Sequence, residues 1–143
     1  MKRSFIILFL VAMTMHVYAQ KDSTSFKGYL YNEEYQVYID MDFYNNLSVP
    51  GQEIFGKLPG YFGAKRDTRK WLFTSVKIKN PKTAKIGIIN DYGSEDLNAT
   101  LTKNDQNSYT FTQDNGSSIK IAVNRKWVKI PSKIIFTRIT NKK

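Results

Sequence analysis

The chain has 143 residues, no cysteine, and 22 basic against 12 acidic residues, which gives a formal net charge of +10. Without cysteine there is no disulfide and no thiol chemistry. The single histidine, His16, lies within the first 19 residues, so the usual zinc ligands and the usual base of hydrolytic triads are nearly absent. Aromatic residues make up 14% of the chain and supply bulk for a core held by packing alone.

The first 19 residues have the pattern of a secretory signal peptide. Lys2 and Arg3 precede an apolar run that ends at Met15, and small residues lead to Ala19. The run is too short to span a bilayer as a helix, and no later stretch approaches that length. We therefore expect cleavage after Ala19, a single domain over residues 20–143 without a transmembrane segment, and a periplasmic or secreted location.

A strand with period-two alternation is predicted over residues 34–44, where every second residue is apolar. Residues 26–31 can fold back onto it across a turn at residues 32–33. Setting Leu30 opposite Tyr35 makes one face of this hairpin apolar throughout, which favours that register.

Residues 72–123 predict a five-stranded antiparallel meander with one continuous apolar face. At residues 114–116, a three-residue loop with Gly116 in the left-handed region sets Phe111 opposite Ile119, whereas a two-residue turn would set Phe111 opposite Lys120. The first register keeps the face apolar. The apolar face is expected to carry Leu72, Thr74, Val76, Ile78, Ile86, Ile88, Leu97, Ala99, Leu101, Tyr109 and Phe111.

The remaining segments complete the fold prediction. Residues 133–139 resemble a further strand after the break at Pro131, and residues 49–70 contain one or two short, bent strands with a loop, although residues 67–70 could instead form a helical turn. About eight strands and no amphipathic helix indicate an all-β protein, either a barrel or a sandwich. We favour an up-and-down antiparallel meander that closes into a barrel of about eight strands.

The first third of the mature chain resembles small secreted calycin-like barrels of Bacteroidetes, which are relatives in shape of the lipocalins. The resemblance rests on FKG at residues 26–28, YQVYIDM at residues 35–41, Gly56, and Gly60-Tyr61. It implies a barrel, and some such barrels resemble inhibitors or immunity proteins that cap a partner. The lipocalin Gly-x-Trp signature is absent from the first strand, so the resemblance does not extend to a lipocalin-type pocket.

The charge is unevenly distributed, because residues 20–114 are balanced and residues 115–143 contain no acidic residue. Successive turns of a meander alternate between its ends, so turns 80–83 and 103–107 and the chain after residue 123 are expected at one end. This arrangement predicts a basic cap that suits an acidic protein or an anionic envelope surface; the alternative is a solvated rim. Export argues against nucleic acid. The cap consists of Lys82, Lys85, Lys103, Arg125, Lys126 and Lys129.

Aromatic residues offer two further candidate surfaces. Tyr29, Tyr31 and Tyr38 point outward by parity and form a candidate partner-binding face, unless the N-terminal segment or the 45–70 loop covers them. Arg-Lys-Trp occurs twice, ending at Trp71 and at Trp127. The two copies are either interface hot spots or side chains that close a barrel end.

No residue set predicts catalysis, a metal site or a cofactor. Asp40 and Asp42 share a solvated strand face, and the acidic residues at positions 91, 95 and 96 fit a turn better than a cation site. We therefore expect an exported, non-enzymatic binding protein, of inhibitor or immunity type, that caps a protein partner. The alternative is a carrier of a small apolar ligand inside the barrel, although inward-pointing Phe43 and Tyr109 leave such a ligand little room.

Overall fold

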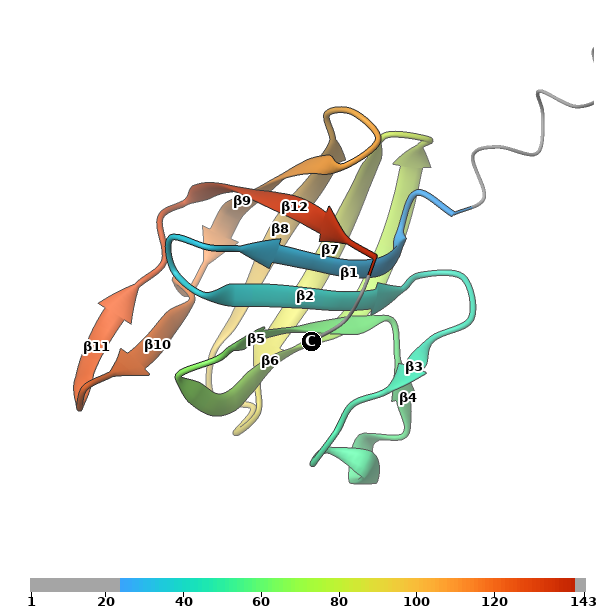
Figure 1. Cartoon of the computed structure of the whole chain (residues 1–143). Coiled ribbons are helices and arrows are strands. Elements are labelled where there is room, and N and C mark those ends of the chain that lie inside the picture. Colours follow the sequence, from blue (N-terminus) through green and yellow to red (C-terminus); the bar gives the residue numbers. More distant parts are fainter. Residues whose placement is uncertain (1–23, 141–143) are drawn as a thin grey trace, which may run out of the picture.

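The computed structural model describes residues 24–140, and its strands close into a barrel in the order β1-β12-β9-β8-β7-β6-β5-β2 (Figure 1). Every neighbouring pair is antiparallel, and the strands follow one another in chain order except where two small hairpins leave the barrel. The predicted all-β, up-and-down barrel of eight strands is confirmed. The predicted signal peptide and its cleavage site lie outside the described residues.

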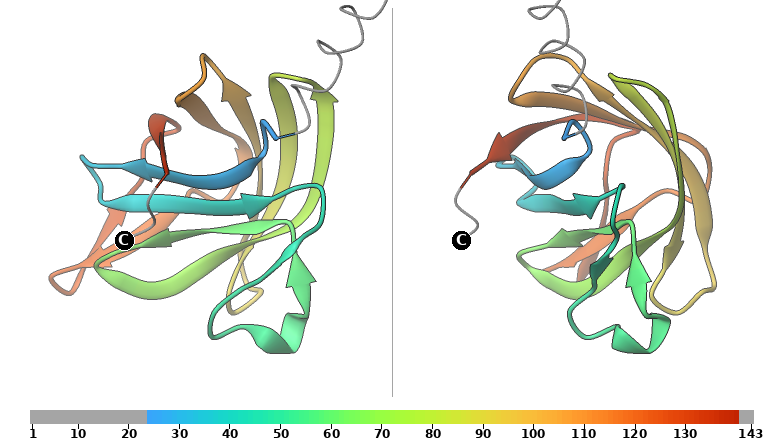
Figure 2. Two further views of the ribbon diagram at one scale, coloured as in Figure 1. Left: turned by 45° about the vertical axis from the view of Figure 1, so that its right-hand side comes forward. Right: turned by 90° about the vertical axis from the view of Figure 1, so that its right-hand side faces the viewer.

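The two extra hairpins project from the barrel wall (Figure 2). We call residues 47–58 the flap and residues 120–129 the finger. The flap contains β3 (Leu47–Ser48), the 3-10 turn η2 (Glu53–Phe55) and β4 (Lys57–Leu58), and the finger pairs β10 (Lys120–Val123) with β11 (Lys126–Lys129). The barrel strands are β1 (Lys27–Asn32), β2 (Val37–Asp42), β5 (Gly60–Ala64), β6 (Asp67–Asn80), β7 (Thr83–Asn90), β8 (Asp96–Lys103), β9 (Ser108–Gly116) and β12 (Lys133–Ile139).

Aromatic rings fill the interior of the barrel. Phe62, Phe111 and Phe136 come from three different strands, have no exposed surface, and form a mutually contacting triad with ring centroids 5.7 to 6.1 Å apart. Phe26 stacks on Phe43 at 5.5 Å toward one end. Successive side chains of a strand point to opposite faces, so every second residue points into the barrel. The rings at these inward positions meet in the interior.

Arg138 of β12 closes one end of the barrel. Its guanidinium donates hydrogen bonds to the carbonyl oxygens of Lys27 (2.6 Å) and Ser25 (3.0 Å) and to the Tyr109 hydroxyl. A side chain at Gly28, whose φ is +136°, would collide with this guanidinium. The contacts join the start of β1 to β9 and β12.

The predicted register of the first hairpin is wrong. The structure pairs Leu30 with Ile39 instead of Tyr35, because the turn spans residues 33–36. The Asn32 side chain stabilises this longer turn by accepting a 2.8 Å hydrogen bond from the Tyr35 amide. The error of four residues is even, so every side chain keeps its predicted face.

A bulge in β6 overturns part of the second prediction. Phe73 pairs with Ile88 and Ser75 with Gly87, so Thr74 is the extra residue and the side chains change face there. Phe73 belongs to the barrel interior, whereas Leu72 lies in a separate outer cluster. The prediction that Leu72 shares a face with Val76 is therefore wrong. Beyond the bulge Val76 pairs with Ile86, and Ile78 pairs with Ala84 in place of the predicted Ile86.

The strand predicted at residues 119–123 does not continue the meander. Phe111 on β9 pairs with Ile134 of β12 and not with Ile119, because β12 supplies the apolar residues that close the barrel. Residues 120–123 instead pair with β11 in the finger.

The Gly- and Pro-rich stretch 49–70 contains the flap from residue 49 onward, β5 and the first residues of β6. The short strands predicted there are present. Residues 67–70 are extended, so the alternative of a helical turn is wrong. Within residues 24–140, no helix has the length and hydropathy that a membrane crossing requires.

We expect Phe62→Ala to lower the free energy of unfolding by about 3–5 kcal/mol, because it empties the centre of the ring triad. Urea unfolding measures the change. Ile135→Ala is the matched control, since Ile135 on β12 is 57% exposed. Equal, small effects of the two substitutions would contradict a packed interior.

Candidate functional site

The three predicted tyrosines lie on the outer wall and are partly buried. Tyr29 stacks on Tyr38 at 5.3 Å, and Tyr38 meets Tyr61 edge-on at 5.9 Å. Burial raises the pKa of Tyr29 to about 12, and the neighbouring Tyr38 adds to the rise. Tyr31 lies apart from the stack, with the Lys65 ammonium 4.5 Å from its ring centroid.

The flap covers part of this aromatic group. Val49 of the flap has no exposed surface and packs with Tyr61 and Leu72 in a second core outside the barrel. Tyr38 packs against that core. Of the three predicted tyrosines, Tyr38 therefore fits the covered alternative that was considered for these residues.

The predicted basic cap divides into separate groups. Lys82 and Lys103 lie together at the Arg138 end, where the Lys103 amide donates a 2.7 Å hydrogen bond to the Lys82 carbonyl. Lys85 lies on the outer face of β7, 3.6 Å from the Asp114 carboxylate. The prediction of one contiguous cap is wrong. Its other three members, Arg125, Lys126 and Lys129, belong to the finger, which lies away from the first two groups.

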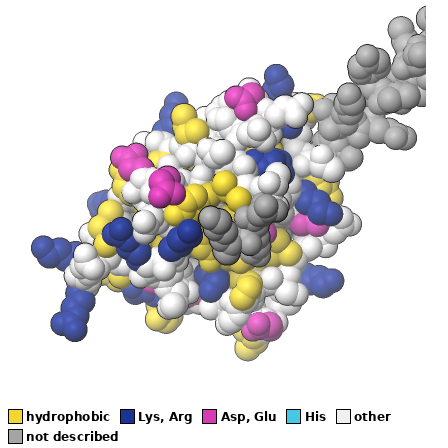
Figure 3. Space-filling view, in the orientation of Figure 1, with side chains coloured by type: hydrophobic (Ala, Val, Ile, Leu, Met, Phe, Trp, Pro, Cys, Tyr) yellow, Lys and Arg dark blue, Asp and Glu magenta, His cyan; other side chains and the backbone are white. Residues whose placement is uncertain are grey.

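The finger is a compact basic projection. Its two-residue turn has positive φ at Asn124 (53°) and Arg125 (67°), the conformation that matches the twist of a hairpin. Arg125, Lys126 and Trp127 are exposed. The finger also carries Lys120 and Lys129 and has no acidic side chain. Figure 3 shows basic side chains projecting over it at the left of the view.

A cleft of about 260 Å³ opens between the finger, the start of β6 and the loop after β7. It lies at the end of the barrel opposite the Arg138 contacts. Sequence reasoning did not predict it. Its lining residues are Asp67, Arg69, Lys70, Trp71, Asn90, Asp91, Tyr92, Ser94, Glu95, Lys120 and Trp127.

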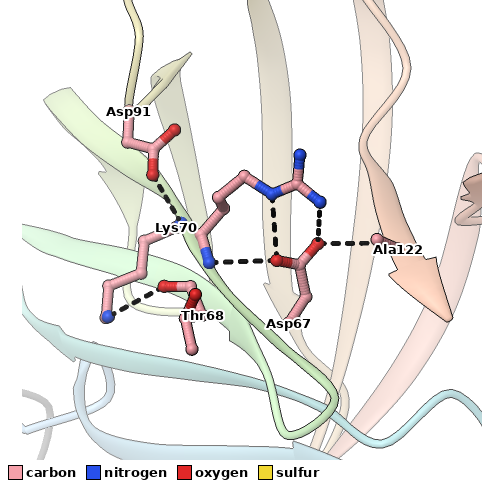
Figure 4. Close-up of polar contacts among 6 residues, drawn as sticks. Asp67, Thr68, Lys70, Asp91 and Ala122 are labelled. Carbon is pink, nitrogen blue, oxygen red and sulfur yellow. Dashed lines mark hydrogen bonds and ion pairs between the residues drawn. The ribbon is translucent and has the colours of Figure 1, made fainter. Parts of the chain in front are cut away.

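Asp67 attaches the finger to the barrel (Figure 4). One carboxylate oxygen accepts hydrogen bonds from the Ala122 amide (2.8 Å) and the Arg69 guanidinium (3.2 Å), and the other accepts two more from Arg69. The Asp67 side chain is only 7% exposed. Burial by itself raises the pKa of this carboxyl, but the hydrogen bonds from Arg69 and Ala122 outweigh it and hold the pKa below its usual value.

Arg69 links the Asp67 carboxylate to Trp127 at the surface of the cleft. Its guanidinium lies 4.4 Å from the ring centroid of Trp127, and the Lys120 ammonium lies 5.8 Å from the same ring. Trp127 is still 58% exposed, whereas Trp71 is 5% exposed and packs in the barrel. The two Arg-Lys-Trp motifs thus have different environments: Trp71 is buried in the core and Trp127 is at the surface.

The opposite wall of the cleft is an ordered loop. The buried Asn90 side chain accepts hydrogen bonds from the amides of Ser94 (2.9 Å) and Glu95 (3.1 Å), which fixes the loop between β7 and β8. Glu95 forms a 3.0 Å ion pair with Lys120 of the finger. Tyr92 stands at the top of this wall, 78% exposed.

The flap tip also lies at this end, beside the loop after β7 in all three ribbon views (Figures 1 and 2). Hydrogen bonds from backbone amides, chiefly those of Glu53 and Gly51, lower the pKa of Glu53, and the charge of Lys70 contributes as well. Ile54 and Phe55 are 91% and 47% exposed. The flap thus adds apolar surface near the cleft.

The charged side chains of the cleft are balanced and partly paired. Three cations and three carboxylates line the cleft, and two opposite pairs are in direct contact, Asp67 with Arg69 and Glu95 with Lys120. Among residues 24–140, no group of three or more His, Cys, Asp and Glu side chains is placed to hold a metal ion.

Comparisons with models of known protein families, with curated protein sequences and with solved structures found no match. The fold and the site define a closed antiparallel barrel with an ordered, charge-paired cleft at one end. Such a barrel is not specific to calycin-like proteins, so that resemblance stays a prediction.

We expect Asp67→Asn to loosen the finger and to lower the free energy of unfolding by about 1–3 kcal/mol, because it removes the charge that holds Arg69 and the Ala122 amide. Because the folded-state pKa is lowered, this stabilisation is present above the usual carboxyl pKa of 3.8 and is lost as the pH falls through the folded value.

Hydrogen exchange checks the effect directly. The protection factor of the Ala122 amide should fall in Asp67→Asn at pH 7, and in the unmodified chain only as the pH falls below the usual carboxyl pKa of 3.8 and through the lowered folded-state pKa of Asp67. Asp96→Asn, at an exposed carboxylate of β8, is the control. Unchanged protection of Ala122 in Asp67→Asn would refute the role of this carboxylate.

Proposed function

We propose that the chain is an exported, non-enzymatic binding protein, of inhibitor or immunity type, that caps an acidic protein partner with its finger. The observation that carries the proposal is the exposed Trp127 on the finger, a hairpin with an excess of positive charge. Arg69 of β6 lies over its ring and restrains it. Tryptophan and arginine are the residues most enriched at binding hot spots. A basic surround steers an acidic partner toward them.

The finger is ordered before any partner arrives. Asp67 holds β10 through the Ala122 amide, and the ion pair of Lys120 with Glu95 holds the finger to the loop wall. A surface that is already ordered loses little conformational entropy on binding. This order supports a role for the finger as a docking element.

The flap enlarges the apolar area at the same end. A stable protein interface buries about 800 Å² on each partner, more than a two-stranded finger offers alone. Ile54 and Phe55 at the flap tip and Tyr92 in the cleft lining are exposed side chains that a partner could cover.

The alternative function, a carrier with an apolar ligand inside the barrel, has less support. An eight-stranded barrel holds a ligand only if its inward side chains leave room. Phe62, Phe111, Phe136 and Tyr109 occupy the interior and have no exposed surface. The cleft is open and lies at the barrel end, outside this ring-filled volume.

Charge reversal at the finger tests the proposal. We expect Arg125→Glu/Lys126→Glu to reduce, by about tenfold or more, the partner recovered by affinity capture from an envelope extract, because two favourable charge pairs become repulsive. Quantitative mass spectrometry of the captured proteins measures the loss.

The chain offers a matched control at its other end. Lys82→Glu/Lys103→Glu makes the same change in net charge but should leave capture unchanged. Equal losses in both double variants would mean that net charge alone attracts the partner. Undiminished capture by the finger variant would reject the finger as the docking element.

A further inference from the structure

We infer that the cleft beside the finger binds a neutral saccharide, with one pyranose ring stacked against Trp127. The inference goes beyond the proposed protein partner and does not require one. It rests on the charge balance of the cleft, its aromatic walls, its size and its order.

The charges that line the cleft cancel. Arg69 and Lys120 are each paired with a carboxylate at 3.0 Å, and the lining as a whole has equal numbers of basic and acidic residues. An anionic or cationic ligand would have to compete with these pairs and leave one partner without its counter-charge. A neutral ligand avoids that cost. A wholly apolar ligand is disfavoured too, since it would cover six charged side chains without replacing their hydrogen bonds with water.

Hydroxyl groups suit the remaining polar atoms. The Lys70 ammonium donates a 3.2 Å hydrogen bond to the Thr68 carbonyl and can donate others, because it has three protons (Figure 4). Beside Lys70, at the end of the neighbouring strand β7, the Asp91 carboxylate accepts a long hydrogen bond, 3.4 Å, from the Lys70 amide and has further acceptor capacity. A sugar hydroxyl both donates and accepts, so adjacent hydroxyls can bind the carboxylate and the ammonium together.

The walls provide an aromatic platform. Trp127 stands on the finger and Tyr92 on the loop, and they are 58% and 78% exposed. The face of an aromatic ring is electron-rich, and the axial C–H groups of a pyranose present a weakly positive, apolar face. Arg69 restrains the indole at 4.4 Å, so the platform is in place before a ligand binds.

The dimensions favour a small ring over a larger ligand. Pockets for drug-sized molecules have about 300–1,000 Å³, and the cleft has about 260 Å³. One sugar ring can therefore occupy the cleft, and adjoining rings of an oligosaccharide can extend through its open side. Asn90 and Asp67 fix the two walls, which lowers the entropic cost of binding.

The test is titration of the full domain with three neutral trisaccharides, maltotriose, cellotriose and chitotriose, followed by tryptophan fluorescence and isothermal titration calorimetry. We expect saturable binding of at least one of them. Trp127→Ala should weaken that binding at least tenfold, and Tyr92→Ala and Asp91→Asn should each weaken it several-fold. Because Trp127 and Tyr92 are largely exposed, these variants should keep the unfolding midpoint of the parent chain.

Charged probes and the finger variant separate this inference from the proposed function. Trigalacturonate and inorganic phosphate should bind more weakly than the best neutral trisaccharide. Arg125→Glu/Lys126→Glu, which lies outside the cleft lining, should keep saccharide affinity within twofold while losing the protein partner.

The inference is overturned by any of three results: no saturable binding of the neutral trisaccharides, equal binding by Trp127→Ala, or tighter binding of a charged probe. None of these results bears on capture of a protein partner by the finger. Conversely, if the finger variant captures the protein partner undiminished, the proposed function fails and the saccharide titration still tests this inference.

Discussion

The filled barrel interior is the constraint on which the rest of the structure depends. Phe62, Phe111 and Phe136 meet at the centre, and their rings use the volume that a carrier barrel keeps for its ligand. Arg138 closes one end by joining the first strand to the last. The interior and this end are thus occupied, and the finger, the ordered loop and the flap tip lie toward the other end (Figures 1 and 2).

Asp67 has the corresponding role at the opposite end of the barrel. A single carboxylate receives the Ala122 amide of the finger and the guanidinium of Arg69, and Arg69 in turn lies against Trp127. A hairpin of two short strands has little stability by itself. The nearly buried Asp67 carboxylate thus turns a marginal hairpin into a fixed wall of the cleft. Through Arg69, the same carboxylate also orients the Trp127 ring.

The strands and most of their partners were predictable, whereas the registers and the second partner of β9 were not. Alternation identified β12 and the faces of β8 and β9, because the period of two is local to each strand. Register depended on details that alternation does not carry: the hydrogen bond of Asn32 lengthened the first turn, and the extra residue Thr74 reversed the faces within β6. The repeated Arg-Lys-Trp motif lies at the cleft, but nothing in the sequence showed that Arg69 of the first copy contacts Trp127 of the second.

The sequence by itself determined the all-β class, the inward aromatic residues and the excess of positive charge after residue 115, because composition and alternation are properties of the chain. Only the tertiary structure decided where that charge lies. Closing the barrel required β9 to pair with β12, which brought in Ile134 and Phe136 and left residues 120–129 to pair with one another. That choice of partner moved Arg125 and Lys126 to the end opposite Lys82, since pairing between distant strands depends on the packing of the whole barrel and not on any local pattern.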